Sequence, residues 1–312
     1  MDLQTLSQLT VNGLINGSVY GLLGVGFALI LGVTGRFHFA YALTYTAGGY
    51  ASALIASGTG IPAGLSVVIG LAVAIVVGVA TELLVYRPVV RRAGANALLA
   101  VFVASLMLTI VGEAFVNLMW GLSNLNRQLT LFGVTTRFVG STTFTNLDVV
   151  IVAVSWIVIA LVVGFLRMTD AGRQTRAVRS NSMMAEAVGI SARRIFLLVF
   201  AIGSLISGIA GVLYTVKYAA VPNMGQRPVF YAFVVAFLGG IRRSPLVVGA
   251  SGLLLGLVES LSGLWLGAQW SSLVVFAVLF LYLSWKAAVL EIAQWDVYRR
   301  LRRAPLLPRR GV

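Results

Sequence analysis

The chain has 312 residues, of which 59% are hydrophobic and only 10% are charged, and its mean hydropathy is +0.96. Soluble domains carry roughly 25% charged residues, so this composition excludes a soluble globular protein and indicates an all-α, polytopic integral membrane protein. The chain has no cysteine, which excludes disulfides, thiol nucleophiles and cysteine-based metal sites.

Several apolar stretches approach the roughly 20 residues that cross a bilayer. They lie near residues 9–34, 40–57, 62–85, 96–120, 147–166, 195–216, 228–240, 245–266 and 270–285. The stretch 228–240 is short and ends in glycine, which is compatible with a half-helix or a re-entrant segment. We therefore predict about eight to ten transmembrane helices in a single domain over residues 1–285, followed by a basic tail over residues 286–312.

The distribution of basic residues predicts the orientation of these helices. With the N-terminus outside, 19 of the 23 lysines and arginines fall on the cytoplasmic side, and only Arg127, Arg137, Lys217 and Arg227 stay outside. Positive charge is enriched in cytoplasmic loops, so we expect an external N-terminus and a cytoplasmic C-terminus. The net charge of +14 therefore reflects membrane topology, and no nucleic-acid partner is expected.

Two polar segments flank the spans. The external segment 121–146 is rich in threonine and glycine and alternates in a way that could form a short hairpin. The tail mixes tryptophan and tyrosine with arginine, which is typical of an interfacial helix held by membrane lipid.

Small residues recur at helical spacing in the first and sixth spans. Gly13, Gly17 and Gly21 share one helix face, and Gly208 and Gly211 follow serines four residues earlier. Such grooves let helix backbones approach closely. Helix packing is the simplest interpretation, and helices that slide during a transport cycle are an alternative.

Polar residues inside the apolar stretches are candidates for a transport pathway, because they are costly in the membrane. The candidates are Asn12, Asn16, Tyr41, Tyr45 and Glu113. Tyr20 lies near Asn12 and Asn16 on the first span, and these three side chains could line an entry path or only hydrogen-bond to neighbouring helices. Glu259 also lies inside an apolar run, where structural pairing is an equally simple role. For Glu82 we expect an ion pair with Arg87 or Arg91 at a helix end.

The sequence argues against an enzyme. His38 is the only histidine, which excludes a histidine-rich metal site, and the sequence has no Gly-x-Ser-x-Gly elbow. The phosphate-binding pattern GxxxxGK[ST] is also missing from the sequence. We therefore expect no catalytic residues, no metal and no cofactor.

The stretch RSNSMMAEAVGISARRI, residues 179–195, interrupts the apolar pattern. Ser182 to Val188 can form a two-turn helix with an apolar face, and Gly189 supplies a stop signal. A short helix that presents methionine suits docking on a soluble partner, although it could simply rest on lipid headgroups.

This region resembles the permease family of branched-chain amino acid ABC importers. Its loop resembles the family's at Arg176-Ala177, Ala187 and Gly189-Ile190, and the following span at Phe200, Gly203 and Ala210–Leu213. The stretch NGLINGSVYGLLGVGFALILGVTG, Glu82 with Tyr86-Arg87-Pro88, and AFLGGIRRSPLVVGASGLLLGLVESL are similar as well. The resemblance covers about residues 9–285 in order.

The resemblance implies a multi-pass permease of the cell (inner) membrane. Its partners would be two ABC ATPase subunits, a second permease subunit that is identical or homologous, and an extracytoplasmic substrate-binding protein. Loop 167–195 would carry the coupling helix. The residues implied to contact the ATPase are Arg176, Ser182, Met183, Met184, Glu186, Ala187 and Gly189.

The sequence departs from the family pattern along the expected pathway. The family's Asn-Phe-Ala-His-Gly-Glu segment is replaced by residues 38–43, and a lysine usual in the seventh span is Tyr231 here. These changes predict a less charged pathway and a substrate less polar than an amino acid, or one held mainly by its binding protein.

Two other functions are compatible with the composition. A secondary transporter or channel would work without an ATPase and could use Glu113 and Glu259 for ion coupling. A membrane scaffold would only pack its spans. Neither requires a docking helix at 182–188.

Overall fold

The computed structural model describes residues 3–120, 128–139 and 142–286. The predicted basic tail lies almost wholly outside the described residues. The helices are α1 (Leu3–Thr34), α2 (Tyr41–Gly58), α3 (Ala63–Ala80), α4 (Arg87–Ala93), α5 (Ala97–Trp120), α6 (Asn146–Met168), α7 (Asp170–Ser180), α8 (Ser182–Ala187), α9 (Ala192–Lys217), α10 (Gln226–Gly239) and α11 (Pro245–Ser262), followed by a helix over Ser271–Lys286.

Each apolar stretch predicted from the sequence is helical in the structure. Five continuous helical stretches in the described chain are long and apolar enough to cross a membrane: Gln4–Thr34, Ala63–Met119, Asn146–Met168, Ala192–Lys217 and Pro245–Ser262. Helix α10 has 14 residues and is therefore about 21 Å long, short of a hydrocarbon core of about 30 Å. This agrees with the prediction that the stretch 228–240 is unusually short.

The chain does not turn after residue 85, where the predicted third span ends. The helix continues through a π-helical turn, η1 (Thr81–Tyr86), into α4. The N–H of Arg87 reaches the carbonyl of Glu82, five residues back. Pro88 follows and lacks an N–H donor, so the wider turn accommodates a position where the ordinary helical hydrogen bond cannot form.

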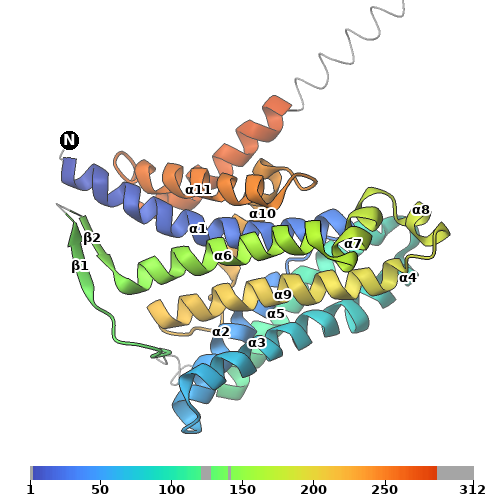
Figure 1. Ribbon diagram of the computed structural model, residues 1–312, viewed down its shortest axis with the longest axis horizontal. Coiled ribbons are helices and arrows are strands. Elements are labelled where there is room, and N and C mark those ends of the chain that lie inside the picture. The colour runs from blue at the N-terminus through green and yellow to red at the C-terminus, as the bar shows by residue number, and fades with distance from the viewer. Residues whose placement is uncertain (1–2, 121–127, 140–141, 287–312) are drawn as a thin grey trace, which may run out of the picture.

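Helix α1 runs through the centre of the bundle and packs against α6, α9, α10 and α11 (Figure 1). Its residues 21–31 are all buried. The closest approach is to α11: a Cβ atom at Gly17 would lie 2.8 Å from the carbonyl oxygen of Gly252, and one at Gly13 would lie 3.0 Å from that of Gly256. The glycine face of α1 therefore lies directly against the backbone of α11.

A second close approach joins α2 to α9. A Cβ atom at Gly48 would lie 2.6 Å from the Cα atom of Gly208, and the Ser207 hydroxyl donates to the carbonyl of Tyr41 at 3.0 Å.

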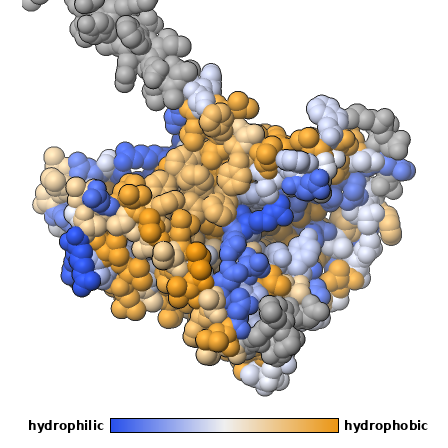
Figure 2. Space-filling model, turned by 180° about the vertical axis from the view of Figure 1, so that it is seen from behind, coloured by the Kyte–Doolittle hydropathy of each residue, from blue (hydrophilic) through white to orange (hydrophobic). Residues whose placement is uncertain are grey.

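Large apolar side chains cover much of the outer surface of the protein, whereas hydrophilic residues gather around a hollow (Figure 2). This is the distribution expected of a protein surrounded by lipid.

A two-stranded antiparallel hairpin, β1 (Thr136–Val139) and β2 (Thr142–Thr145), lies at the end of the bundle near the start of α1 (Figure 1). It confirms the hairpin suggested by the alternating sequence. The Gln8 side-chain amide donates to the Thr143 carbonyl at 2.9 Å and accepts from its N–H at 2.8 Å. Gln8 thereby acts as an extra strand partner and joins the hairpin to α1.

Candidate functional site

A cavity of about 760 Å³ opens among α1, α9 and α10, at the end of the bundle that carries the hairpin. Its volume lies within the range of about 300–1,000 Å³ that is common for ligand pockets. The lining residues are Ile15, Asn16, Val19, Tyr20, Tyr45, Ile151, Ala210, Leu213, Tyr214, Lys217, Tyr218, Val221, Asn223, Met224, Gln226, Arg227, Pro228, Tyr231, Glu259 and Ser271.

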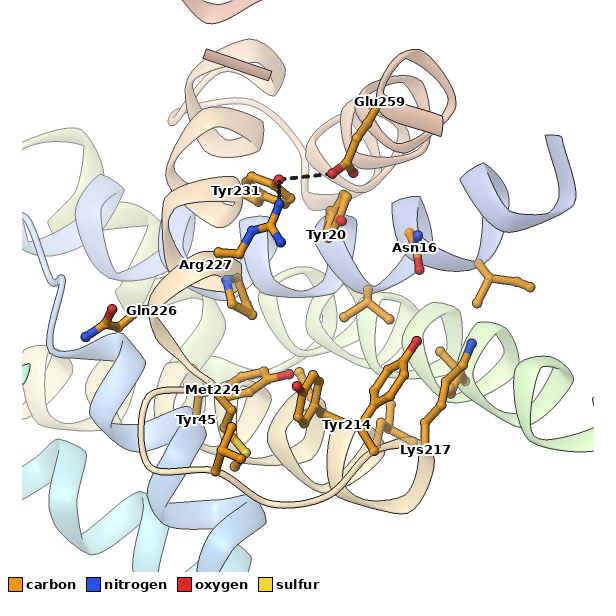
Figure 3. Close-up of a pocket in the computed structure, with 18 of the residues that line it drawn as sticks. Asn16, Tyr20, Tyr45, Tyr214, Lys217, Met224, Gln226, Arg227, Tyr231 and Glu259 are labelled. Atoms are coloured by element: carbon orange, nitrogen blue, oxygen red, sulfur yellow. Dashed lines mark hydrogen bonds between the residues drawn. The ribbon is translucent and has the colours of Figure 1, made fainter. Parts of the chain in front are cut away.

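One wall of the cavity joins α1, α10 and α11 through polar contacts (Figure 3). The Tyr231 hydroxyl donates to Oε1 of Glu259 at 3.0 Å, and its ring packs edge to face against Tyr20 with ring centroids 4.8 Å apart. Arg227, one helical turn before Tyr231, donates to the Ser272 hydroxyl at 2.7 Å. This wall therefore presents both signs of charge to the cavity.

The opposite wall belongs mainly to α9 and is aromatic. Tyr214 packs against Tyr45 and Tyr218, with ring centroids 6.1 and 5.0 Å away. Lys217 ends α9 and pairs with Asp148 of α6, with Nζ and Oδ1 2.6 Å apart. Asp148 also accepts from the Thr145 N–H at 2.9 Å in a capping box, so one carboxylate fixes the start of α6 and the end of α9.

The predicted pathway residues divide between the cavity and its surroundings. Asn16 and Tyr45 line the cavity. Asn12 is not among the lining residues and accepts from Gln8 at 3.2 Å. Tyr41 is fully buried against α1, with its hydroxyl 3.4 Å from the Leu23 carbonyl. The structure thus brings two of these four side chains to the cavity.

Glu113 lies beside the cavity rather than in it. It lines a separate pocket of about 10 Å³ and accepts a hydrogen bond from Gln226, which itself lines the main cavity. Glu113 therefore touches the main cavity only through Gln226.

Tyr20, which the sequence analysis grouped with Asn12 and Asn16, also lines the cavity. Several other cavity residues were not among the sequence candidates: Tyr214, Lys217, Tyr218, Arg227 and Tyr231. Each lies at or near the end of a span, where tyrosine and basic residues are usually assigned to the membrane interface. The sequence signal for Arg227 and Tyr231 was their spacing of four residues, which places both on one face of α10. Three of the lining residues carry charge, namely Lys217, Arg227 and Glu259.

Helix α8 lies at the other end of the bundle, where it contacts α7 and α9 (Figure 1). The Asn181 side chain caps it by accepting from the Met184 N–H at 3.1 Å, and Gly189 ends the turn with a φ of +86°. Met183 and Met184 are 79% and 67% exposed, whereas Ala185 is buried against the protein. The predicted helix therefore ends one residue earlier than expected and presents its methionines outward.

Helix α7 was not predicted, because the segment before residue 182 appeared to be a loop. The Thr169 hydroxyl caps it by accepting from the Gly172 N–H at 2.9 Å. Arg176 donates to the Leu166 carbonyl at the end of α6, and Arg179 donates to the Ile241 carbonyl at 3.0 Å. Burial, and then the nearby charge of Arg242, lowers the pKa of Arg179. Helix α7 thus ties the α8 region to α6 and to the segment between α10 and α11.

A buried ion pair network lies close to this end. Glu82 is fully buried and pairs with Arg36 and Arg87, the latter at 3.2 Å, so the pairing predicted for Arg87 is confirmed. Arg87 also donates to the Arg193 carbonyl at 3.0 Å, at the start of α9. His38 is buried, with Nδ1 2.8 Å from the Tyr86 hydroxyl.

In residues 3–120, 128–139 and 142–286, no group of three or more histidines, cysteines, aspartates or glutamates is placed to hold a metal ion.

Known proteins are similar in sequence to this chain over most of its length. Residues 9–283 match the model of the branched-chain amino acid transport system / permease component family. The high-affinity branched-chain amino acid transport system permease protein LivH of Escherichia coli (strain K12) is 32% identical over 287 residues, which cover 87% of this chain and 91% of the relative. LivH of Salmonella typhimurium is 31% identical with the same coverage.

A more distant relative agrees with this assignment. Permease protein BraD of Pseudomonas aeruginosa is 28% identical over 306 residues, covering 89% of this chain and 93% of the relative. The solved structure of PsaBC from Streptococcus pneumoniae in complex with Fab is 12% identical, with a TM-score of 0.49, and covers 89% of this chain and 90% of that chain. The extent of the family match and the identity to LivH are decisive: the chain belongs to the family of branched-chain amino acid transport system permease components.

Proposed function

We propose that this chain forms the translocation pathway of an ABC importer for a branched-chain amino acid or a related small solute. Separate ATPase subunits would hydrolyse ATP, since the chain is a transport subunit without a catalytic site. The relatives named above are permeases of high-affinity branched-chain amino acid transport systems, which supports this substrate class.

The main support for the proposal is that α9 links the α8 region to the cavity. This helix begins at Ala192, just after α8, and ends at Lys217, whose side chain lines the cavity. A rigid helix of 26 residues is about 39 Å long, so it connects the exposed methionines directly to the solute cavity. Docking of an ATPase on α8 would move α9 and thereby change the cavity.

We propose an orientation in which α8 faces the cytoplasm and the cavity opens to the outside. Arg167, Arg173, Arg176, Arg179, Arg193 and Arg194 surround the α8 region in sequence, whereas the segment 121–146 carries Arg127 and Arg137. Cytoplasmic segments are enriched in such residues. Eight to ten transmembrane helices would form one domain over residues 1–285, and the basic tail 286–312 would contact membrane lipid.

The remaining partners follow from this arrangement. A substrate-binding protein would deliver solute at the outer end, near the hairpin and the cavity. A second permease, identical or homologous, would complete the membrane unit. The apolar outer surface of Figure 2 offers the area that lipid and a second permease would cover.

A secondary transporter that works without an ATPase is the alternative function. It would use Glu113 or Glu259 for ion coupling. Glu113 bonded to Gln226 in a pocket of about 10 Å³ has little room for a hydrated ion. The exposed α8 would have no purpose in such a protein, which favours the ABC importer.

Purification of the tagged chain from its native membrane tests the proposal. We expect an ABC ATPase to co-purify with the wild-type chain and to be lost when Met183 and Met184 are both changed to glutamate. Met119→Glu is the matched control, because Met119 is 55% exposed at the far end of α5 and should leave the ATPase bound. If no ATPase accompanied the folded wild-type chain, the secondary transporter would become the better account.

A further inference from the structure

The cavity contains two opposite charges that face each other without forming an ion pair. Arg227 comes from the first turn of α10, and Glu259 comes from the last turns of α11 (Figure 3). In the part of the chain that the structure describes, neither has a partner of opposite charge within 4.0 Å, whereas Lys217 of the same cavity is paired with Asp148. Arg227 and Glu259 therefore remain available to a ligand.

The Tyr231 hydroxyl keeps the two charges apart. It lies 3.0 Å from Oε1 of Glu259 and 3.5 Å from Nη2 of Arg227, so it stands between them as a neutral bridge. The Ser272 hydroxyl lies 2.7 Å from the same guanidinium nitrogen and 3.2 Å from the Tyr231 hydroxyl. These two hydroxyls fix Arg227 without neutralising its charge.

Glu259 has unused hydrogen-bonding capacity. Its Oε1 accepts from Tyr231, but its Oε2 is buried and has no hydrogen-bond partner in the described structure. A carboxylate oxygen without a donor is costly in the membrane interior. An ammonium group supplies three donors and would satisfy this oxygen.

We propose that Arg227 and Glu259 form a recognition site for a small zwitterion, in which Arg227 binds the carboxylate and Glu259 binds the ammonium group. The inference rests on the proposed transport function and deepens it, because it assigns the recognition of the two charges of the solute to Arg227 and Glu259. A neutral solute would leave the charges of both Arg227 and Glu259 uncompensated. A singly charged solute would leave one of these two charges uncompensated. The cavity therefore selects a molecule that carries both charges close together.

The size of the cavity limits how tightly this site binds. At about 760 Å³ the cavity leaves room around a small solute, and Tyr45, Tyr214 and Tyr218 on the opposite wall offer an apolar surface to its side chain. The charges would then choose the class of solute, and the aromatic wall would tolerate different side chains. Weak binding suits a pathway that must release its solute to the other side.

Competition for tritiated leucine tests the inference. The full-length chain is placed in nanodiscs with its co-purifying subunits and without a binding protein. Unlabelled leucine, leucinamide, which lacks the carboxylate, and 4-methylpentanoate, which lacks the ammonium group, serve as competitors. A charge-assisted hydrogen bond predicts that each single-charge analogue competes about tenfold or more weakly than leucine.

Variants assign each charge to its residue. In Arg227→Gln, leucine should bind as weakly as leucinamide does, and leucinamide itself should be unaffected. In Glu259→Gln, leucine should bind as weakly as 4-methylpentanoate does. Arg227→Lys should keep the preference for a carboxylate, and Arg137→Gln, which removes an exposed charge of the hairpin, should change nothing.

Three results would overturn the inference: equal competition by all three ligands in the wild type, an equal loss for all three in both glutamine variants, or no displaceable leucine binding at all. If a glutamine variant is not monodisperse on gel filtration, the comparison of the three ligands on the wild-type protein still tests whether the cavity recognises both charges. ATP-driven uptake of leucine by vesicles is measured in parallel. Its absence would contradict the proposed function, whereas uptake with indifferent competition would contradict only the charge-recognition site.

Discussion

The Glu82 carboxylate pairs with the Arg36 guanidinium and so joins the π-helical turn η1 to the segment between α1 and α2. The Glu82 side chain is fully buried and that of Arg36 is 13% exposed. Arg87 adds a second ion pair and connects the carboxylate to the start of α9. One buried carboxylate therefore links three elements near the α8 end of the bundle.

Loss of this carboxylate should destabilise the protein strongly. Glu82→Ala leaves two poorly solvated arginines without an acceptor, and the removal of one partner from a buried ion pair costs about 3–5 kcal/mol. We expect a clearly lower melting temperature of the detergent-solubilised protein in a fluorescence-detected gel-filtration assay. Asp170→Asn, which removes an ion pair with Arg173 whose side chains are 61% and 80% exposed, should leave the melting temperature nearly unchanged. Similar melting temperatures for the two variants would contradict a structural role for the network.

The contact between α1 and α11 should not tolerate a single added methyl group. In Gly252→Ala the new Cβ atom would meet the backbone of Gly21 and lie 2.8 Å from the Gly17 carbonyl oxygen. Overpacking of this kind costs about 1–3 kcal/mol. Gly164→Ala is the matched control, because no atom lies within 4 Å of its Cβ position. We expect the first variant to lower the yield of monodisperse protein and the second to leave it unchanged or raised.

Two buried serines on α9 should respond differently to alanine. The Ser207 hydroxyl bridges α9 and α2 by donating to the Tyr41 carbonyl at 3.0 Å. The Ser204 hydroxyl is buried without a hydrogen-bond partner in the described structure. Hydrogen bonds between membrane helices contribute about 0.6 kcal/mol on average, so Ser207→Ala should lower the free energy of unfolding by about that amount. Ser204→Ala should be neutral or stabilising, and a loss larger than that of Ser207→Ala would contradict the assigned contacts.

The proposed orientation can be tested with single cysteines, because the chain contains none of its own. Arg137→Cys on the hairpin should react with a membrane-impermeant maleimide in intact cells. Met183→Cys on α8 should react only after the membrane is permeabilised, although its side chain position is 79% exposed. The reverse pattern would show that α8 faces the outside and would exclude docking of a cytoplasmic ATPase there.

The sequence was informative wherever a local property decides the structure. Apolar run length predicted the long helices such as α1 and α6, since a membrane-spanning segment needs about 20 apolar residues. The apolar face of Ser182–Val188 and the stop signal at Gly189 predicted α8 to within one residue, because a positive φ at a helix end depends only on neighbouring residues. Helix α7 was missed since its residues are mostly polar, although Thr169 followed by Asp170 is a typical helix start.

The cavity depends on packing, and most of it could not be predicted. Arg227 and Glu259 are 32 positions apart, and the packing of α10 and α11 against each other and against α1 brings them to one wall. Tyr41 appeared equally suitable from its polarity, yet it lies against α1, where its hydroxyl approaches the Leu23 carbonyl. The direction of a side chain on a buried helix follows from its neighbours, which a single sequence does not supply.

A site-specific cross-link is the most direct test of the central claim that α8 docks on an ATPase. Met184→Cys, whose native side chain is 67% exposed, would carry a maleimide–benzophenone in native membranes, with Met119→Cys as the control. We predict an adduct between the chain and an ABC ATPase subunit from Met184→Cys only. An equal adduct from Met119→Cys, or labelled Met184→Cys that never captures an ATPase, would contradict the account.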